Sequence, residues 1–276
     1  MVRAVDAVWI LPPQVATLGS AVALVAALSW RAGAAFAVVV FMGLTLQSPA
    51  PFLKQWNAGQ GDAALARFDD GASWVLDAGP AFSWRPERWM HRLAESGVSR
   101  VDLAVLSHLD EDHRGGLAAL LAWIQVDEGV ARTEHLQEAR ERYPGLTWRT
   151  PQENPKGGWS WFQPQVAKSA NGVMLGWAWK QGERLYLNLG DAPEKLERSL
   201  ERELARMGAL EWTWKLSHHG SRTSTPAEWF SRFPIREAWV SAGHANQHGH
   251  PHASVLRKIP LRVRVRVTSE EGDLFW

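Results

Sequence analysis

The stretch SHLDEDHRGG, residues 107–116, constrains the fold of this chain more than any other. It joins an apolar, strand-like segment at residues 101–106 to a helix start at residues 117–121, which predicts a strand-to-helix loop. Carboxylates crowded onto one loop repel each other unless a cation lies among them, and nitrogen and oxygen donors without thiolate suit Zn²⁺ or Mn²⁺. We therefore predict a metal-binding loop, the alternative being a solvated acidic loop with two incidental histidines. The candidate ligands are His108, Asp110, Asp112 and His113.

The histidines of the chain are concentrated in loops. Eight of the ten lie at residues 108–113, 218–219 and 244–252, and each of these loops follows an apolar strand-like segment. Together with the nearby carboxylates they supply enough ligands for two metal ions with open coordination positions. His91 and His135 lie elsewhere and are interpreted as surface residues.

Amino-acid composition and net charge exclude several kinds of functional site. The 276 residues include no cysteine, which excludes thiolate zinc sites, disulfides and a cysteine nucleophile. A net charge of +1 excludes steering toward nucleic acid by the charge of the whole chain. Many of the 17 tryptophans lie two residues apart, which places both rings on one face of a strand. We interpret them as core packing, with a platform for stacking bases as the alternative.

Residues 7–47 carry no charge apart from Arg31. Two apolar runs, at residues 15–30 and 32–46, flank that arginine, and the doubled pattern fits a cleaved signal peptide poorly. It predicts a membrane hairpin, or the last two crossings of a larger channel, with a buried helical pair as the alternative. If Arg31 faces the cytoplasm, the rest of the chain lies on the outer side of the membrane. We place the hairpin at residues 1–47 and a second domain at residues 48–276.

The second domain has a layered α/β pattern. Before the metal loop we predict three strands and a helix, at residues 52–56, 63–68, 74–79 and 85–96. After it, a hairpin at residues 172–189 ends on Asp191, a carboxylate at a strand's carboxyl end, where open α/β folds place chemistry. A charged helix follows at residues 193–207, then further strands that end at residues 216 and 240.

The alternating segment at residues 262–267 predicts a half-buried strand with a row of arginines facing outward. These arginines are candidate DNA contacts, and a solvated strand face is the alternative. They are Arg262, Arg264 and Arg266.

Five motifs resemble those of known proteins. Residues 107–116 resemble the metal-binding motif of the metallo-β-lactamase superfamily, in the variant where Asp110 replaces the middle histidine. The other four resemble motifs in the extracytoplasmic domain of the ComEC competence-channel family. They are NAGQGDA at residues 57–63, LGDA at 189–192, SHHGS at 217–221 and GHPH at 249–252. The resemblance covers residues 52–276, and the preceding hydrophobic pair is similar to the end of that family's membrane region.

The resemblance implies an αββα sandwich with two divalent metal ions, Zn or Mn, at one edge of the paired sheets. By position, His108 and Asp110 would hold one metal, Asp112 and His113 the other, and Asp191 would bridge them. His219 would complete the second metal's ligands while His218 faces the substrate. His250 would either contact phosphate or stabilise its loop.

The same resemblance implies residues that border the site, and it also shows where this sequence differs from the family's motifs. Gln60 and Asp62 would border the site, with Asp62 orienting ligands rather than binding metal. Asn57 stands where the family usually has Asp. The superfamily's third metal-binding histidine has no convincing counterpart between residues 117 and 190, where Asn171 is a further polar candidate.

The implied function is a nuclease that degrades one strand of incoming DNA during competence-related uptake, with Asp112, His218 and His250 in catalysis. Its partners would be DNA and the membrane channel portion of the same or a neighbouring chain, and it would need no dinucleotide cofactor. The soluble domain would lie on the extracytoplasmic side of the inner (cytoplasmic) membrane. The alternatives are a hydrolase of a lactone, a thioester or a cell-wall phosphodiester, and a DNA-guiding module whose metal site has decayed.

Overall fold

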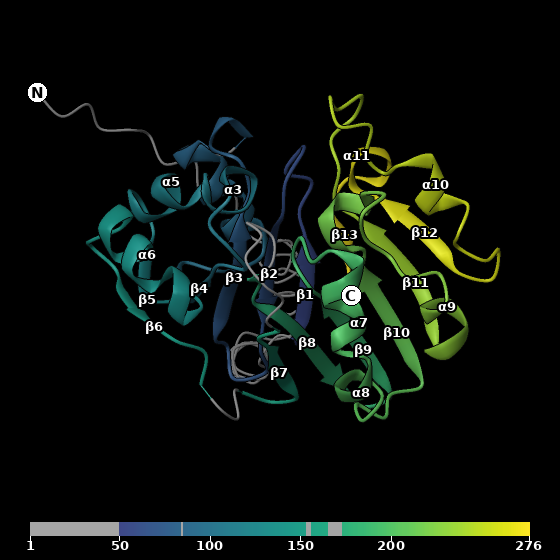
Figure 1. Ribbon diagram of the computed structural model, residues 1–276. Coiled ribbons are helices and arrows are strands. Elements are labelled where there is room, and N and C mark those ends of the chain that lie inside the picture. The colour runs from purple at the N-terminus through teal and green to yellow at the C-terminus, as the bar shows by residue number, and fades with distance from the viewer. Residues whose placement is uncertain (1–49, 84, 153–155, 165–172) are drawn as a thin grey trace, which may run out of the picture.

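The computed structural model describes residues 50–83, 85–152, 156–164 and 173–276. They form two facing β-sheets with helices on the outer faces, which is the expected αββα sandwich (Figure 1). The hydrophobic hairpin predicted at residues 1–47 lies outside the described residues, so it stays a prediction. No helix in the described part of the chain has the length and hydropathy of a membrane span.

The first sheet comes mainly from the first half of the described chain. Its seven strands stand in the order β13-β1-β2-β3-β4-β5-β6. Strands β1 to β3 are antiparallel and β3 to β6 are parallel, while β13 returns from the end of the chain to pair with β1. The strands are β1 (Phe52–Gln55), β2 (Ala63–Arg67), β3 (Ser73–Ala78), β4 (Arg100–Val105), β5 (Gln125–Val130), β6 (Thr147–Arg149) and β13 (Leu274–Phe275).

The second sheet has six strands in the order β12-β11-β10-β9-β8-β7. The predicted hairpin is present as antiparallel β8 and β9, and β9 to β12 are parallel. Each sheet therefore has parallel strands whose carboxyl ends reach one edge. The strands are β7 (Trp159–Phe162), β8 (Gly176–Gln181), β9 (Arg184–Asn188), β10 (Glu211–Lys215), β11 (Ile235–Val240) and β12 (Arg264–Val267).

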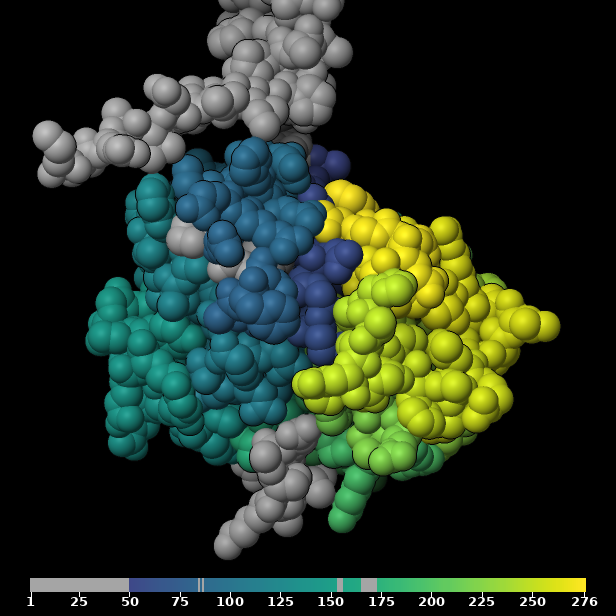
Figure 2. Space-filling model, turned by 90° about the horizontal axis from the view of Figure 1, so that it is seen from above, coloured from purple at the N-terminus to yellow at the C-terminus, as the bar shows by residue number. Residues whose placement is uncertain are grey.

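Helices bury the outer face of each sheet. Apolar residues of α3, α5 and α6 pack on the first sheet, and those of α7, α8, α9 and α10 pack on the second. The two sheet-and-helix halves lie side by side when the molecule is viewed from above (Figure 2). The helices are α3 (Pro86–Glu95), α4 (Glu111–Arg114), α5 (Leu117–Leu121), α6 (Leu136–Arg142), α7 (Glu194–Ser199), α8 (Glu201–Leu204), α9 (Trp229–Arg232), α10 (Ala253–Leu256) and α11 (Thr268–Glu271).

Tryptophan fills much of the layer between the sheets. Trp177 and Trp179 on β8 are both fully buried there, as their spacing of two predicts. Trp74 of the first sheet stacks on Trp161 of the second, with ring centroids 5.8 Å apart and planes 9° apart. Core packing is thus the confirmed use of these described tryptophans, because large rings from both sheets interdigitate between them.

Two predicted elements differ from the structure. The charged helix predicted at residues 193–207 divides at Leu200 into α7 and α8. The strand predicted at residues 262–267 begins only at Arg264, where pairing with β11 begins, so Arg262 lies before it. The prediction that three arginines form a row along one strand is therefore wrong.

Candidate metal centre

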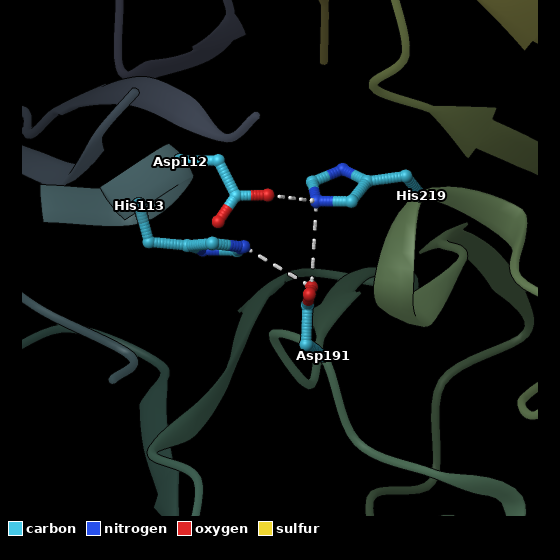
Figure 3. Close-up of side chains that lie close together, drawn as sticks. All are labelled: Asp112, His113, Asp191 and His219. Carbon is cyan, nitrogen blue, oxygen red and sulfur yellow. Dashed lines mark hydrogen bonds and ion pairs between the residues drawn. The ribbon is translucent and has the colours of Figure 1, made fainter. Parts of the chain in front are cut away.

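Three loops at the carboxyl ends of β4, β9 and β10 bring four potential metal ligands together. Asp112 and His113 lie on α4, just after β4, while Asp191 follows β9 and His219 lies on a short 3₁₀ turn after β10. All four side chains point toward a common centre (Figure 3). Segments more than a hundred residues apart thus supply one site, because the parallel strands end at the same edge of the sandwich.

The spacing of the donor atoms suits a metal ion. One ligand atom from each of the four residues lies within 4.8 Å of all the others. His113 Nε2 is 3.1 Å from Asp191 Oδ1, and His219 Nε2 is 3.1 Å from Asp112 Oδ2 and 3.6 Å from Asp191 Oδ1. Metal–ligand bonds of about 2.0–2.2 Å place neighbouring donors roughly 3–3.5 Å apart.

Unpaired buried atoms support the same conclusion. His108 Nε2, His113 Nε2 and Asp191 Oδ1 are buried without a hydrogen-bond partner in the described structure. Buried polar atoms in proteins almost always have a partner, and two of these atoms, His113 Nε2 and Asp191 Oδ1, lie 3.1 Å apart within the four-residue group. A divalent cation between them would satisfy both, so the residues present fit the metal that the sequence predicts.

Hydrogen bonds at the other ring nitrogens direct Nε2 toward the centre. His113 Nδ1 lies 2.8 Å from Asp77 Oδ2, and His219 Nδ1 lies 2.8 Å from the Ser241 carbonyl oxygen. Both acceptors require a proton on Nδ1, which leaves the Nε2 lone pair free for a metal. Each histidine is therefore held in the tautomer that binds metal through Nε2.

Asp77 is a site residue that the sequence analysis missed. It is the second-last residue of β3 and has a left-handed backbone conformation, with φ +53°. Its carboxylate accepts hydrogen bonds from the Ser107 amide at 2.7 Å and the Ser107 hydroxyl at 2.8 Å. It thereby joins β3 to the metal loop and orients His113. A signal was present, because Asp77, like Asp191, lies at the carboxyl end of an apolar strand-like segment of the sequence.

Asp62 lies next to His219, and the orienting role that the resemblance implies for it stays a prediction. It is buried, its Oδ1 lies 3.7 Å from His219 Nδ1, and it forms an ion pair with buried Lys215. Its amide also donates to the Asp112 carbonyl at 3.0 Å. Gly61 permits this approach, because its φ is +144° and a Cβ there would lie 2.3 Å from that same carbonyl oxygen. The sequence analysis did not identify Lys215.

His108 and Asp110 lie beside the four-residue group rather than in it. The His108 ring centroid is 4.1 Å from that of His113, and His108 Nε2 is 3.4 Å from Asp110 Oδ2. Asp110 has a side chain that is 55% exposed. The pair assigned to a first metal is thus adjacent to the centre, while Asp112, His113, Asp191 and His219 form its compact part.

His218 and His250 border the centre on its open side. His218 Nε2 is 3.6 Å from Asp191 Oδ2, and the rings of His218 and His250 have centroids 5.7 Å apart. Gln60 Oε1 accepts from the Gly243 amide at 3.3 Å, so its Nε2 donates to His250 Nδ1 at 3.4 Å. His250 therefore carries its proton on Nε2 and is a hydrogen-bond donor there.

The histidines and carboxylates of the centre shift one another's pKa values. Burial by itself lowers the pKa of His113, but Asp191 and Asp77 outweigh burial and hold that pKa well above its usual value. Burial likewise raises the pKa of Asp191, but His113 and His219 hold it well below the usual range. Burial lowers the pKa of His218, and it lowers that of His250 to about 4. Ionised carboxylates thus line the centre, and a neutral His250 lies at its rim.

Asn171 is outside the described residues. His135, expected at the surface, is half-buried and its Nε2 lies 3.1 Å from the Val173 carbonyl oxygen.

The terminal arginines have partners within the chain. Arg262 donates to the Phe230 carbonyl, and Arg264 lies 3.6 Å from Glu271. Arg266 donates to Glu271 at 2.8 Å. Contact of these arginines with DNA stays a prediction.

A family model described as the metallo-beta-lactamase superfamily matches residues 56–256. Among curated proteins, the chain is 25% identical over 255 residues to ComE operon protein 3 of Bacillus subtilis, covering 79% of this chain and 32% of that protein. It is 27% identical over 221 residues to competence protein ComA of Neisseria gonorrhoeae, covering 74% and 29% of the two. It is also 27% identical over 238 residues to recombination protein 2 of Haemophilus influenzae, covering 81% and 28%. These are ComEC-family competence proteins, and the chain spans about a third of their length.

Solved structures share the fold at low identity. Tm1679, a metal-dependent hydrolase of the β-lactamase superfamily, aligns with a TM-score of 0.57 at 11% identity, covering 82% of this chain and 98% of that one. A diphosphatase from the PhnP family aligns with a TM-score of 0.51 at 13% identity, covering 82% and 97%. At such identities the likeness shows the fold alone.

Proposed function

The chain belongs to the metallo-β-lactamase superfamily of metal-dependent hydrolases, and we propose that it is a nuclease that degrades one strand of DNA during competence-related uptake. The observation that carries this proposal is the convergence of Asp112, His113, Asp191 and His219 on one buried point. Relatives named for competence and recombination support DNA as the substrate class.

The donor set suits hydrolysis of an anionic phosphodiester. A divalent cation, Zn²⁺ or Mn²⁺, would supply Lewis-acid stabilisation of the negative charge that develops on the phosphate oxygens. Asp112, His113, Asp191 and His219 would hold it, and a second ion would use His108 and Asp110. The hydrogen bonds from His113 to Asp77 and from His219 to Ser241 keep the ligand rings oriented.

The two histidines at the rim would act on the substrate. His250 presents an Nε2–H because Gln60 donates to its Nδ1, so we assign it to a hydrogen bond with a phosphate oxygen rather than to loop stabilisation. His218 lies nearer the carboxylates, with Nε2 3.6 Å from Asp191 Oδ2, and we assign it to protonation of the leaving oxygen.

The proposal includes a location and partners. Residues 1–47 would connect this domain to the membrane channel portion of the same or a neighbouring chain. The domain would then lie on the extracytoplasmic side of the inner membrane, where incoming DNA first reaches it.

Replacing Asp112 tests the proposal. In the full chain, Asp112→Ala should reduce metal-dependent cleavage of DNA by at least about a hundredfold, because it removes an ionised ligand without taking anything from the core. Glu111→Ala is the matched control, since Glu111 is the adjacent carboxylate on α4, is exposed and pairs with Arg114 at 3.1 Å. Cleavage of single- and double-stranded DNA is measured with Mn²⁺, Zn²⁺ and Mg²⁺, and circular dichroism checks the fold.

The outcomes separate the candidate functions. Equal activity of Asp112→Ala and wild type would contradict the proposed metal centre. Wild-type protein that binds DNA but cleaves it with none of the metals would support a DNA-guiding module. Protein that neither binds nor cleaves DNA but hydrolyses a lactone or thioester would support the small-ester hydrolase.

A further inference from the structure

A hollow of about 560 Å³ opens beside the metal centre, between the loop that carries His218 and the loop that carries His250. The loops are joined by a hydrogen bond from the His252 amide to the Gly220 carbonyl at 2.9 Å. On the inner side of the hollow, His218 Nε2 lies 3.6 Å from Asp191 Oδ2. A molecule bound at the metal centre therefore has this hollow next to it.

The lining of the hollow differs in charge from the metal centre. Arg222 is its one permanent positive charge, and no aspartate or glutamate is among its described lining residues. The hydroxyls of Ser221 and Thr223, which lie 3.0 Å apart, add hydrogen-bonding groups. Such a lining suits an anion, because a guanidinium stays charged at every physiological pH and donates two parallel hydrogen bonds to phosphate.

Arg222 is also available for a ligand. It is exposed and, within the described ranges, it has no ion pair and no side-chain hydrogen bond. Arg264 and Arg266 each have Glu271 as a partner, and Arg262 is bonded to a backbone carbonyl. The terminal arginines would have to break these contacts to bind DNA, whereas Arg222 would not.

We propose that this hollow, with Arg222 as its charged group, binds the phosphate next to the one that is cleaved. The inference rests on the proposed nuclease function and defines its substrate class as a strand with successive phosphates. A diester with a single phosphate would occupy the metal centre and leave the hollow empty. The hollow would thus favour a polynucleotide over a small ester at the same centre.

The test compares two substrates in the full, metal-loaded chain. Arg222→Ala should raise the KM for a short single-stranded oligonucleotide about tenfold more than that for bis(p-nitrophenyl) phosphate, which has one phosphate. Arg222→Lys should give an intermediate KM, since it keeps the charge but loses the planar fork. Arg202→Ala is the control, because Arg202 is an exposed arginine on α8 without a partner among the described residues. Arg264→Ala should have a smaller effect than Arg222→Ala.

Binding gives a readout that does not depend on turnover. In the Asp112→Ala background, Arg222→Ala should weaken oligonucleotide binding in fluorescence anisotropy and reduce the slope of log K against log salt by about 0.7. Equal affinity with and without Arg222 would overturn the inference, as would an equal loss of activity on both substrates. Failure of wild-type protein to cleave either substrate would instead reject the nuclease, and the anisotropy result would still decide the role of Arg222.

Discussion

At the scale of single residues, the groups that contact the candidate ligands would set how strongly the proposed centre binds metal. Asp77 is fully buried, touches His113 and Ser107, and has no access to solvent. Its carboxylate both fixes the His113 tautomer and makes that ring more basic, which strengthens its bond to a cation. Asp77 is therefore a positioning residue, and its effect should appear in metal affinity.

Asp77→Asn should lower metal affinity by about 10- to 100-fold, because an amide orients the His113 proton less well than a carboxylate does. Asparagine also tolerates the positive φ at this position, so the backbone of β3 should survive. Competition with a chelating dye measures the affinity. Asp102→Asn is the control, since Asp102 caps Ser73 at the opposite end of the strands. An unchanged metal affinity in Asp77→Asn would show that the Asp77 contact has no part in binding.

At the scale of elements, a buried carboxyl joins α7 to the segment that follows His218 and His219. Glu197 lies on α7, and its Oε2 accepts from the Thr225 amide at 2.8 Å. Burial raises the pKa of Glu197 to about 8, although Lys258 and the hydrogen bonds oppose the rise, and Glu194 adds to it. The helix therefore packs with a neutral glutamic acid at neutral pH.

The raised pKa of Glu197 predicts that the stability of the protein falls as pH rises. A group whose folded pKa is raised contributes its full stability below its unfolded pKa of 4.5 and loses it as pH rises toward about 8. The free energy of unfolding should therefore fall by a few kcal/mol across that window relative to Glu197→Gln, which has no proton to lose. Urea unfolding with chelator present, at several pH values, measures the difference. Glu183→Gln, in the exposed turn between β8 and β9, is the control, and its free energy of unfolding should change with pH as that of the wild type does. If the free energy of unfolding of Glu197→Gln also had the same pH dependence as that of the wild type, the prediction would be refuted.

At the scale of the whole molecule, one buried ion pair links the two halves of the sandwich. Asp62 belongs to the turn before β2 in the first sheet, and Lys215 ends β10 in the second. The two side chains are 2% and 0% exposed, so neither charge has water to replace its partner. The pair lies just behind His219 and connects the ligands of one half to those of the other.

Asp62→Asn should reduce the free energy of unfolding by about 3–5 kcal/mol, because it leaves Lys215 charged and buried without a partner. The double variant Asp62→Leu with Lys215→Met should recover much of this loss, since it removes both charges together. Urea unfolding with chelator present, followed by tryptophan fluorescence, measures the stability. The exposed pair of Arg100 and Asp127 is the comparison, and Asp127→Asn should cost no more than about 1 kcal/mol. Similar small losses for both asparagine variants would contradict a structural role for the buried pair.

The sequence by itself determined the layered α/β fold and the candidate ligands near strand ends. Alternating apolar segments and turn residues are local signals, and a histidine or aspartate directly after a strand is visible without knowing what lies opposite. The resemblance of five motifs in order then placed Asp191 and His219 with the metal loop. Local patterns also predicted the β8–β9 hairpin and the burial of paired tryptophans such as Trp177 and Trp179.

Only the tertiary structure decided which charged side chains are paired and which are free. Lys215 looks like an ordinary lysine in sequence, yet it is buried against Asp62, 153 residues away. In sequence, Arg264 and Arg266 look like unpaired basic residues, yet both form ion pairs with Glu271. Arg222, which lines the hollow beside the metal centre, has no such partner among the described residues. The physical reason is that the partner of a charge is set by the approach of segments distant in sequence, and no local periodicity records that approach.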